Sequence, residues 1–150
     1  MAAEASYLEP NRSQLARLRS LLEGLSDDDL QRRVNEQWTV ADSLGHMAFW
    51  DARVIVLSAK LERGVPFSAS DSEPEDVDWI NDAALPLIHA IPPGEVARLA
   101  IRLAEQADAA VARLDPRRLW PDDPNSPINP LRAAHRGEHL DEIEAALGAG

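Results

Sequence analysis

Apolar residues recur at alternating steps of three and four along several separate segments of this chain. Residues with that spacing lie on one face of a helix, whereas a half-buried strand alternates at every second residue. No segment shows strand-like alternation, and the helical patterns cover residues 11–25, 40–63, 96–114 and 130–147. The sequence therefore predicts an all-α protein in which four principal helices pack as a four-helix bundle.

The segments between these helices predict two long connections. Residues 64–78 are mostly Ser, Asp, Glu and Pro, so they offer little apolar surface to bury and indicate an exposed crossover loop. Residues 115–130 place repeated prolines among polar residues and indicate a second irregular connection. Because the chain has 150 residues and no internal repeat, we expect one domain over residues 1–150.

Prolines also give local signals within the helical patterns. Residues 79–89 have a helical pattern, but Pro86 should kink or interrupt that helix. Asn129 and Pro130 together resemble an N-cap followed by proline at the first helical position. We therefore expect the last helix to begin at Pro130.

The charge and cysteine content exclude several classes of function. The chain has 26 acidic and 15 basic residues, a formal net charge of -11, and no cysteine. An excess of carboxylates repels phosphate backbones and anionic headgroups, so we expect no nucleic-acid or membrane partner. Most of these carboxylates are expected on solvated faces and loops. With no signal sequence and no run of ~20 apolar residues, we expect a cytoplasmic protein, and any metal must be held by His, Asp or Glu.

Three of the four histidines have positions that favour metal binding. His135 and His139 are four residues apart, so both project from one face of the last predicted helix. His46 lies beside Met47 and one turn before Trp50, on or next to the buried seam of its helix. Three imidazoles from two helices, with one coordination position left open, are typical of a catalytic zinc, nickel or iron site. The alternative is that these are hydrogen-bonded histidines of the core, which is the more common fate of a single buried histidine.

The same stretch, HRGEH at residues 135–139, also matches the H-x-x-E-H pattern of the inverzincin metalloproteases. Those enzymes take a third ligand from well downstream, whereas this chain ends at residue 150, and their fold is not all-helical. We therefore reject that assignment. Glu138 remains a candidate for a group that supports a metal ligand, although a solvated glutamate is the more common case.

The segment WTVADSLGHMAFWD at residues 38–51 resembles the second-helix motif of the DinB/YfiT-like superfamily, and H-x-x-x-H at residues 135–139 resembles its last-helix motif. The resemblance implies an up-down-down-up four-helix bundle, commonly a homodimer. It also implies a divalent metal, typically zinc or nickel, held by His46, His135 and His139. The His46 segment and WINDAAL at residues 79–85 resemble the branch related to the N-terminal domain of mycothiol-dependent maleylpyruvate isomerase.

The resemblance further implies a transferase or isomerase that activates a low-molecular-weight thiol of the mycothiol type and acts on a small-molecule substrate. Two alternatives remain open: a metal-dependent hydrolase, and a stress-associated protein that binds a metal or ligand without turnover. Trp50, Trp79 and Asn81 are candidates for the lining of a substrate pocket, with ordinary core packing or helix capping as the other interpretation.

Overall fold

The computed structural model describes residues 4–148, and the protein is helical throughout that range apart from its connections and one isolated bridge between Arg33 and Thr39. The prediction of an all-α chain is confirmed. The helices are α1 (Leu8–Glu23), α2 (Asp27–Leu30), α3 (Val40–Glu62), α4 (Asp78–His89), α5 (Pro93–Ala112) and α6 (Arg132–Gly148), with short 3-10 turns η1 (Ala69–Asp71) and η2 (Pro116–Arg118).

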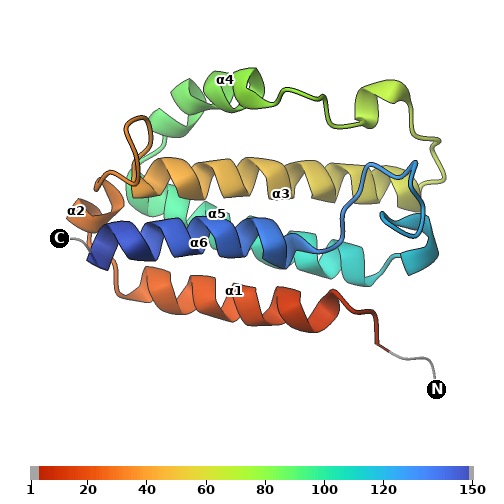
Figure 1. Cartoon of the computed structure of the whole chain (residues 1–150), viewed down its shortest axis with the longest axis horizontal. Helices are drawn as coiled ribbons and strands as arrows, with labels where there is room; N and C mark the ends of the chain where they lie inside the picture. Colours follow the sequence, from red (N-terminus) through yellow and green to blue (C-terminus); the bar gives the residue numbers. More distant parts are fainter. Residues whose placement is uncertain (1–3, 149–150) are drawn as a thin grey trace.

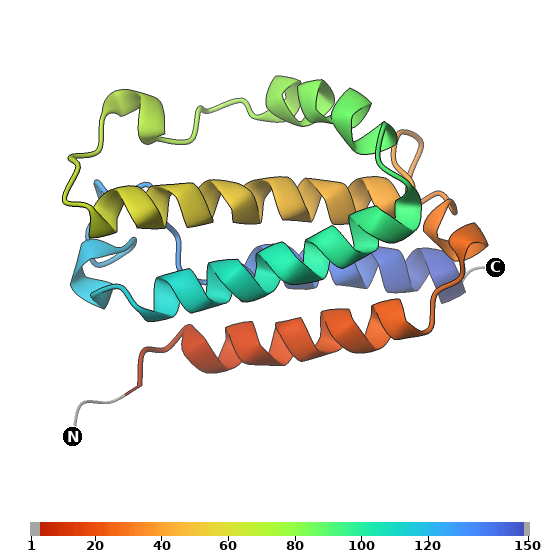
Figure 2. The same cartoon turned by 180° about the vertical axis from the view of Figure 1, so that it is seen from behind.

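The four long helices α1, α3, α5 and α6 lie side by side (Figure 1). Helix α5 packs against α1 and α3, and α6 packs against the same two helices. Helices α1 and α6 run in one direction and α3 and α5 in the other, and α4 covers the outer side of α3 (Figures 1 and 2). Residues 63–77 and 113–131 form the two long connections, which meet near the same end of the bundle.

The first turn of α6 is capped from another helix. The predicted start at Pro130 is wrong by two residues, because the helix begins at Arg132. Asn129 accepts a hydrogen bond from the backbone N–H of Leu131 (3.0 Å), just before the helix. The backbone N–H of Ala133 donates instead to Oδ1 of Asn11 on α1 (2.9 Å), and Nδ2 of Asn11 donates to the carbonyl of Pro130 (2.9 Å). The first turn of α6 is therefore capped by Asn11, a buried asparagine more than 100 residues away, and not by the neighbouring residue that the sequence predicts.

Helix α4 is held close to α3 at a glycine. A Cβ atom at Gly45 would lie 2.6 Å from Cγ2 of Ile88, so only glycine permits this approach. Pro86 lies within α4, which continues from Asp78 to His89, so the prediction of an interruption at this proline is wrong. The close packing of α4 against α3 brings the first turns of α4 toward the middle of α3.

The core consists of two apolar clusters separated by a polar layer. Along α3, Ala48 belongs to the first cluster and Val54 to the second, and the buried Asp51 lies between them. None of the helices in residues 4–148 combines the length and the apolar character needed to span a bilayer.

Candidate metal centre

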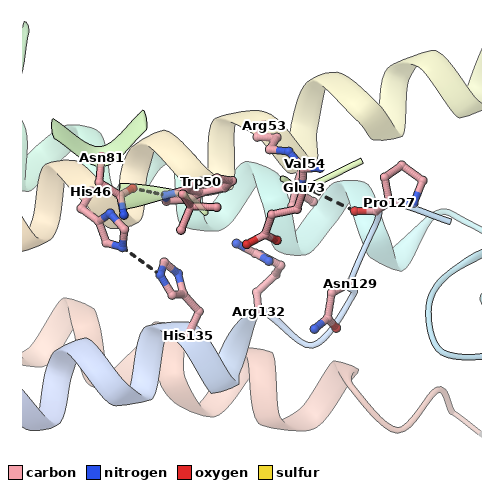
Figure 3. A pocket seen from close by; sticks show the side chains of 11 residues that line it. His46, Trp50, Arg53, Val54, Glu73, Asn81, Pro127, Asn129, Arg132 and His135 are labelled. Atoms are coloured by element: carbon pink, nitrogen blue, oxygen red, sulfur yellow. Dashed lines mark hydrogen bonds between the residues drawn. The ribbon is translucent and has the colours of Figure 1, made fainter. Parts of the chain in front are cut away.

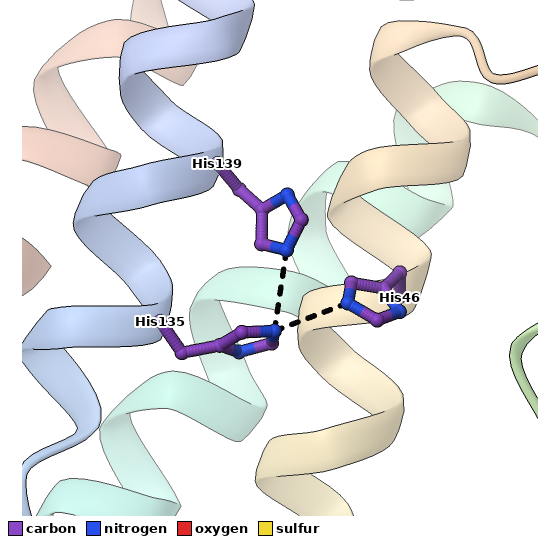
Figure 4. A group of neighbouring side chains, drawn as sticks. All are labelled: His46, His135 and His139. Atoms are coloured by element: carbon purple, nitrogen blue, oxygen red, sulfur yellow. Dashed lines mark hydrogen bonds between the residues drawn. The ribbon is translucent and has the colours of Figure 1, made fainter. Parts of the chain in front are cut away.

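Three imidazoles converge between α3 and α6 (Figure 4). Nε2 of His135 lies 3.0 Å from Nε2 of His46 and 3.2 Å from Nε2 of His139. The candidate ligand atoms of all three side chains lie within 4.8 Å of one another. The helical period places His135 and His139 one above the other on α6, and the packing of α3 against α6 supplies the third ring.

The first turns of α3 and α6 are anchored, which fixes the register of the histidines. Thr39 and Asp42 form a reciprocal capping box at the start of α3. On α6, the capping by Asn11 sits two residues before His135. The three rings therefore project from the buried faces of two helices whose first turns are held by hydrogen bonds.

The histidines are neutral at physiological pH. Burial first, and the neighbouring histidines second, lower the pKa of His46 to about 4 and that of His135 to about 3. Burial also lowers the pKa of His139, although the nearby Glu142 opposes that decrease. Neutral imidazole is the form that binds metal ions. Three converging Nε2 atoms cannot all be satisfied by donating to one another, whereas a divalent cation can accept a lone pair from each, so this donor set fits a divalent metal ion.

A buried ion-pair network lies beside the histidines, on the same two helices and on α5. Nε of Arg132 donates to Oδ1 of Asp51 (3.0 Å), and Arg136 donates through both terminal nitrogens to the carboxylate of Asp108 (3.0 and 2.9 Å). Arg136 also lies 3.7 Å from Asp51. Asp51 and Asp108 are exceptions to the expectation that most carboxylates lie on solvated faces, because both pair with arginines that flank His135.

Two tryptophans surround His46. The ring of Trp38 lies 4.7 Å from the His46 ring and 6.2 Å from the His139 ring. Trp38 lies within the segment that resembles the DinB motif but is not among the predicted site residues, and its one signal in the sequence is its place directly before the helix cap Thr39. Nε1 of Trp50 donates to Oδ1 of Asn81 (2.9 Å), a bond that ties α3 to α4 above the site (Figure 3).

A pocket of about 330 Å³ opens beside two of the histidines (Figure 3). Its lining includes His46, His135, Trp50, Asn81, Arg53 and Arg132. Two of the three residues predicted to line a pocket, Trp50 and Asn81, lie here. The third, Trp79, is 63% exposed and lies outside the pocket. Residues two apart on a helix point to nearly opposite sides, so Trp79 faces away when Asn81 faces inward.

The glutamate nearest the histidines is Glu142 and not Glu138. Glu138 is exposed, whereas Oε2 of Glu142 lies 3.5 Å from Nδ1 of His139. Nδ1 of His139 is itself buried and makes no hydrogen bond within the described residues. A residue three positions along a helix shares the face of His139, whereas the preceding residue is turned about 100° away. The fourth histidine, His89, stays apart, with Nε2 2.9 Å from Oδ1 of Asp42.

A bundle of helices with three inward-facing histidines and an adjoining pocket defines a candidate metalloprotein. Comparison with known families agrees with this class: a model of the DinB superfamily matches residues 11–140, and the chain belongs to that superfamily. The match includes the segment around His46 and ends at residue 140, just beyond His139. No curated protein and no solved structure matched the chain in the corresponding searches.

Proposed function

We propose that this protein binds a divalent metal ion through His46, His135 and His139 and acts as a transferase or isomerase that uses a low-molecular-weight thiol. The observation that carries the proposal is the convergence of three Nε2 atoms, with His135 3.0 and 3.2 Å from the other two, at one end of a pocket. Zinc and nickel are the proposed metals because both accept imidazole ligands.

The remaining residues of the site hold this arrangement and limit access to it. Trp38 packs against the rings of His46 and His139 on one side. The Trp50–Asn81 hydrogen bond fixes the pocket wall on the other. The pocket reaches His46 and His135 but is not lined by His139, so a small molecule in the pocket would meet the site from that side.

A bound divalent ion would stabilise the thiolate form of a thiol at neutral pH. The chain contains no cysteine, so the sulfur would have to come from a cosubstrate, and mycothiol is the thiol that the proposed branch would use. We further propose that α1, α3, α5 and α6 form the up-down-down-up bundle of this family and that the protein is a homodimer. The opposed directions of these helices support the first of these two proposals.

Metal analysis of protein purified without a histidine tag tests the metal site. We expect about one zinc or nickel ion per chain, lost in His46→Ala and in His135→Ala. His89→Ala is the matched control, because His89 lies outside the cluster, and it should retain the metal. An empty site that cannot be loaded with zinc or nickel would contradict the proposal.

Activity assays with the loaded protein then separate the candidate reactions. A thiol transferase or isomerase requires an added thiol, such as mycothiol, to convert a small electrophile. Turnover of an ester or amide without thiol would instead support the hydrolase. A metal-loaded protein with neither activity would support the non-catalytic alternative.

A further inference from the structure

Two arginines give the pocket a positive lining in an otherwise acidic chain. Arg53 on α3 and Arg132 on α6 line the pocket together with one acidic residue, Glu73, from the connection between α3 and α4 (Figure 3). The charged lining therefore has two positive groups and one negative group, while the whole chain carries a formal charge of -11. The formal charge of the pocket lining is therefore positive, whereas that of the whole chain is negative.

Arg53 has no carboxylate partner. Its terminal nitrogens donate to the main-chain carbonyls of Asp71 (2.6 Å) and Pro127 (3.5 Å), and its guanidinium lies 5.7 Å from the centre of the Trp50 ring. Within residues 4–148 no carboxylate oxygen lies within 4.0 Å of it, not even that of Glu73. A half-buried arginine that stays permanently charged has positive charge available for a ligand in the same pocket.

Arg132 has free donors that complement Arg53. Its side chain is 9% exposed, and its Nε donates to Asp51. Neither terminal nitrogen of Arg132 hydrogen-bonds to another residue in the described part of the chain. Because Asp51 holds Nε from behind, the planar group is fixed in orientation, which lowers the entropic cost of binding an oxyanion through the remaining N–H groups.

We infer that the substrate of this protein carries a carboxylate, which binds to Arg132 and Arg53 while the rest of the molecule extends toward His46 and His135. The guanidinium fork matches the two oxygens of a carboxylate. The pocket volume of about 330 Å³ limits the ligand to a small molecule. This inference rests on the proposed function, because it names the substrate class for the same site.

Calorimetric titration of the zinc-loaded protein with succinate and with succinamide tests the inference. The two probes have the same shape, but only succinate is charged. At low ionic strength we expect succinate to bind at least about tenfold more tightly than succinamide. Arg53→Gln should weaken succinate binding about tenfold, the size expected for a lost charge-assisted hydrogen bond, and should leave succinamide binding unchanged.

Arg113→Gln is the matched control, since it changes the net charge equally. Arg113 is exposed, pairs with Glu62 and lies outside the pocket, so this variant should bind succinate as the unmodified protein does. Arg132→Lys keeps a positive charge beside Asp51 but removes the fork, and it should also weaken succinate binding. Equal binding of the two probes, or equal losses in Arg53→Gln and Arg113→Gln, would overturn the inference.

Repeating the titration on metal-free protein separates this inference from the proposed function. If the arginines bind the carboxylate, the preference for succinate persists without zinc. If the preference for succinate disappears when zinc is removed, the carboxylate binds to the ion alone and the inference is wrong. A protein that takes up no zinc but still prefers succinate would contradict the proposed function and retain the carboxylate site.

Discussion

The histidine cluster and the ion-pair network are neighbours on α3 and α6, yet they satisfy their polar atoms in opposite ways. In the network, the carboxylates of Asp51 and Asp108 meet the guanidinium groups of Arg132 and Arg136, so each buried charge has an opposite charge beside it. In the cluster, three neutral bases face one another. The paired charges of the network hold the helices together and leave only the terminal N–H groups of Arg132 for a ligand, whereas the converging acceptors of the cluster can bind a cation from outside the chain.

Breaking the network should have the largest effect on stability. Arg136→Met leaves the partly buried Asp108 without its bidentate partner, and we expect the free energy of unfolding to fall by about 3–5 kcal/mol. Urea denaturation followed by circular dichroism measures the change. Arg98→Met is the control, because Arg98 is exposed and pairs only with Glu95 one turn away, and it should cost less than about 1 kcal/mol. Similar losses in both variants would contradict the structural role of the network.

Supplying the cation should stabilise the cluster and leave the network unaffected. At a free zinc concentration 100 times the dissociation constant, binding adds about 2.7 kcal/mol to the free energy of unfolding. Thermal melts with and without zinc should therefore differ for the unmodified protein and for Arg98→Met, but not for His135→Ala. If zinc stabilises His135→Ala as much as it stabilises the unmodified protein, the ion binds at another site.

The pH dependence of the metal-free protein should come from the cluster. Burial lowers the pKa of His46 to about 4 and of His135 to about 3, below the ~6.5 of an unfolded histidine. At pH values between the folded and the unfolded pKa, the unfolded chain binds more protons than the folded protein. The contribution of these histidines to the free energy of unfolding is therefore present above pH 6.5 and is lost as the pH falls. We expect each of the two histidines to contribute a loss on the order of 2 kcal/mol between pH 7 and pH 5. Urea unfolding at both pH values measures it, and a His46→Gln/His135→Gln double variant should lose most of this dependence.

The smallest expected effect concerns the two glutamates near His139. Glu142→Gln should lower zinc affinity a few-fold, because Oε2 of Glu142 lies 3.5 Å from Nδ1 of His139 and a carboxylate there raises the basicity of the ring. Glu138→Gln has the same change in charge and should leave zinc affinity unchanged, since Glu138 is exposed. Competition with a zinc-binding dye measures both variants. A larger loss of zinc affinity in Glu138→Gln than in Glu142→Gln would contradict the assignment of Glu142 as the glutamate that supports His139.

Features with a local cause could be predicted from the sequence, and those with a partner on another helix could not. The spacing of His135 and His139 already placed both rings on one helix face, and the position of His46 beside Met47 pointed it inward. Trp79 lies outside the pocket and Glu138 is exposed, because a stretch resembling a motif does not say which side of its helix faces the pocket. Arg53, Arg132 and Asp51 gave no signal, since a charged residue in a helix is ordinarily solvated.

The sequence by itself determined an all-helical chain, the long connections, and three histidines at positions that face inward, because the helical period relates neighbouring residues whatever surrounds them. Only the tertiary structure decided that Asn11 caps α6, that Asp51 and Asp108 neutralise two buried arginines, and that His46 meets His135 with their Nε2 atoms 3.0 Å apart. These contacts join residues that are far apart in the chain. They exist only once the helices pack, because packing alone fixes which faces meet and at what register.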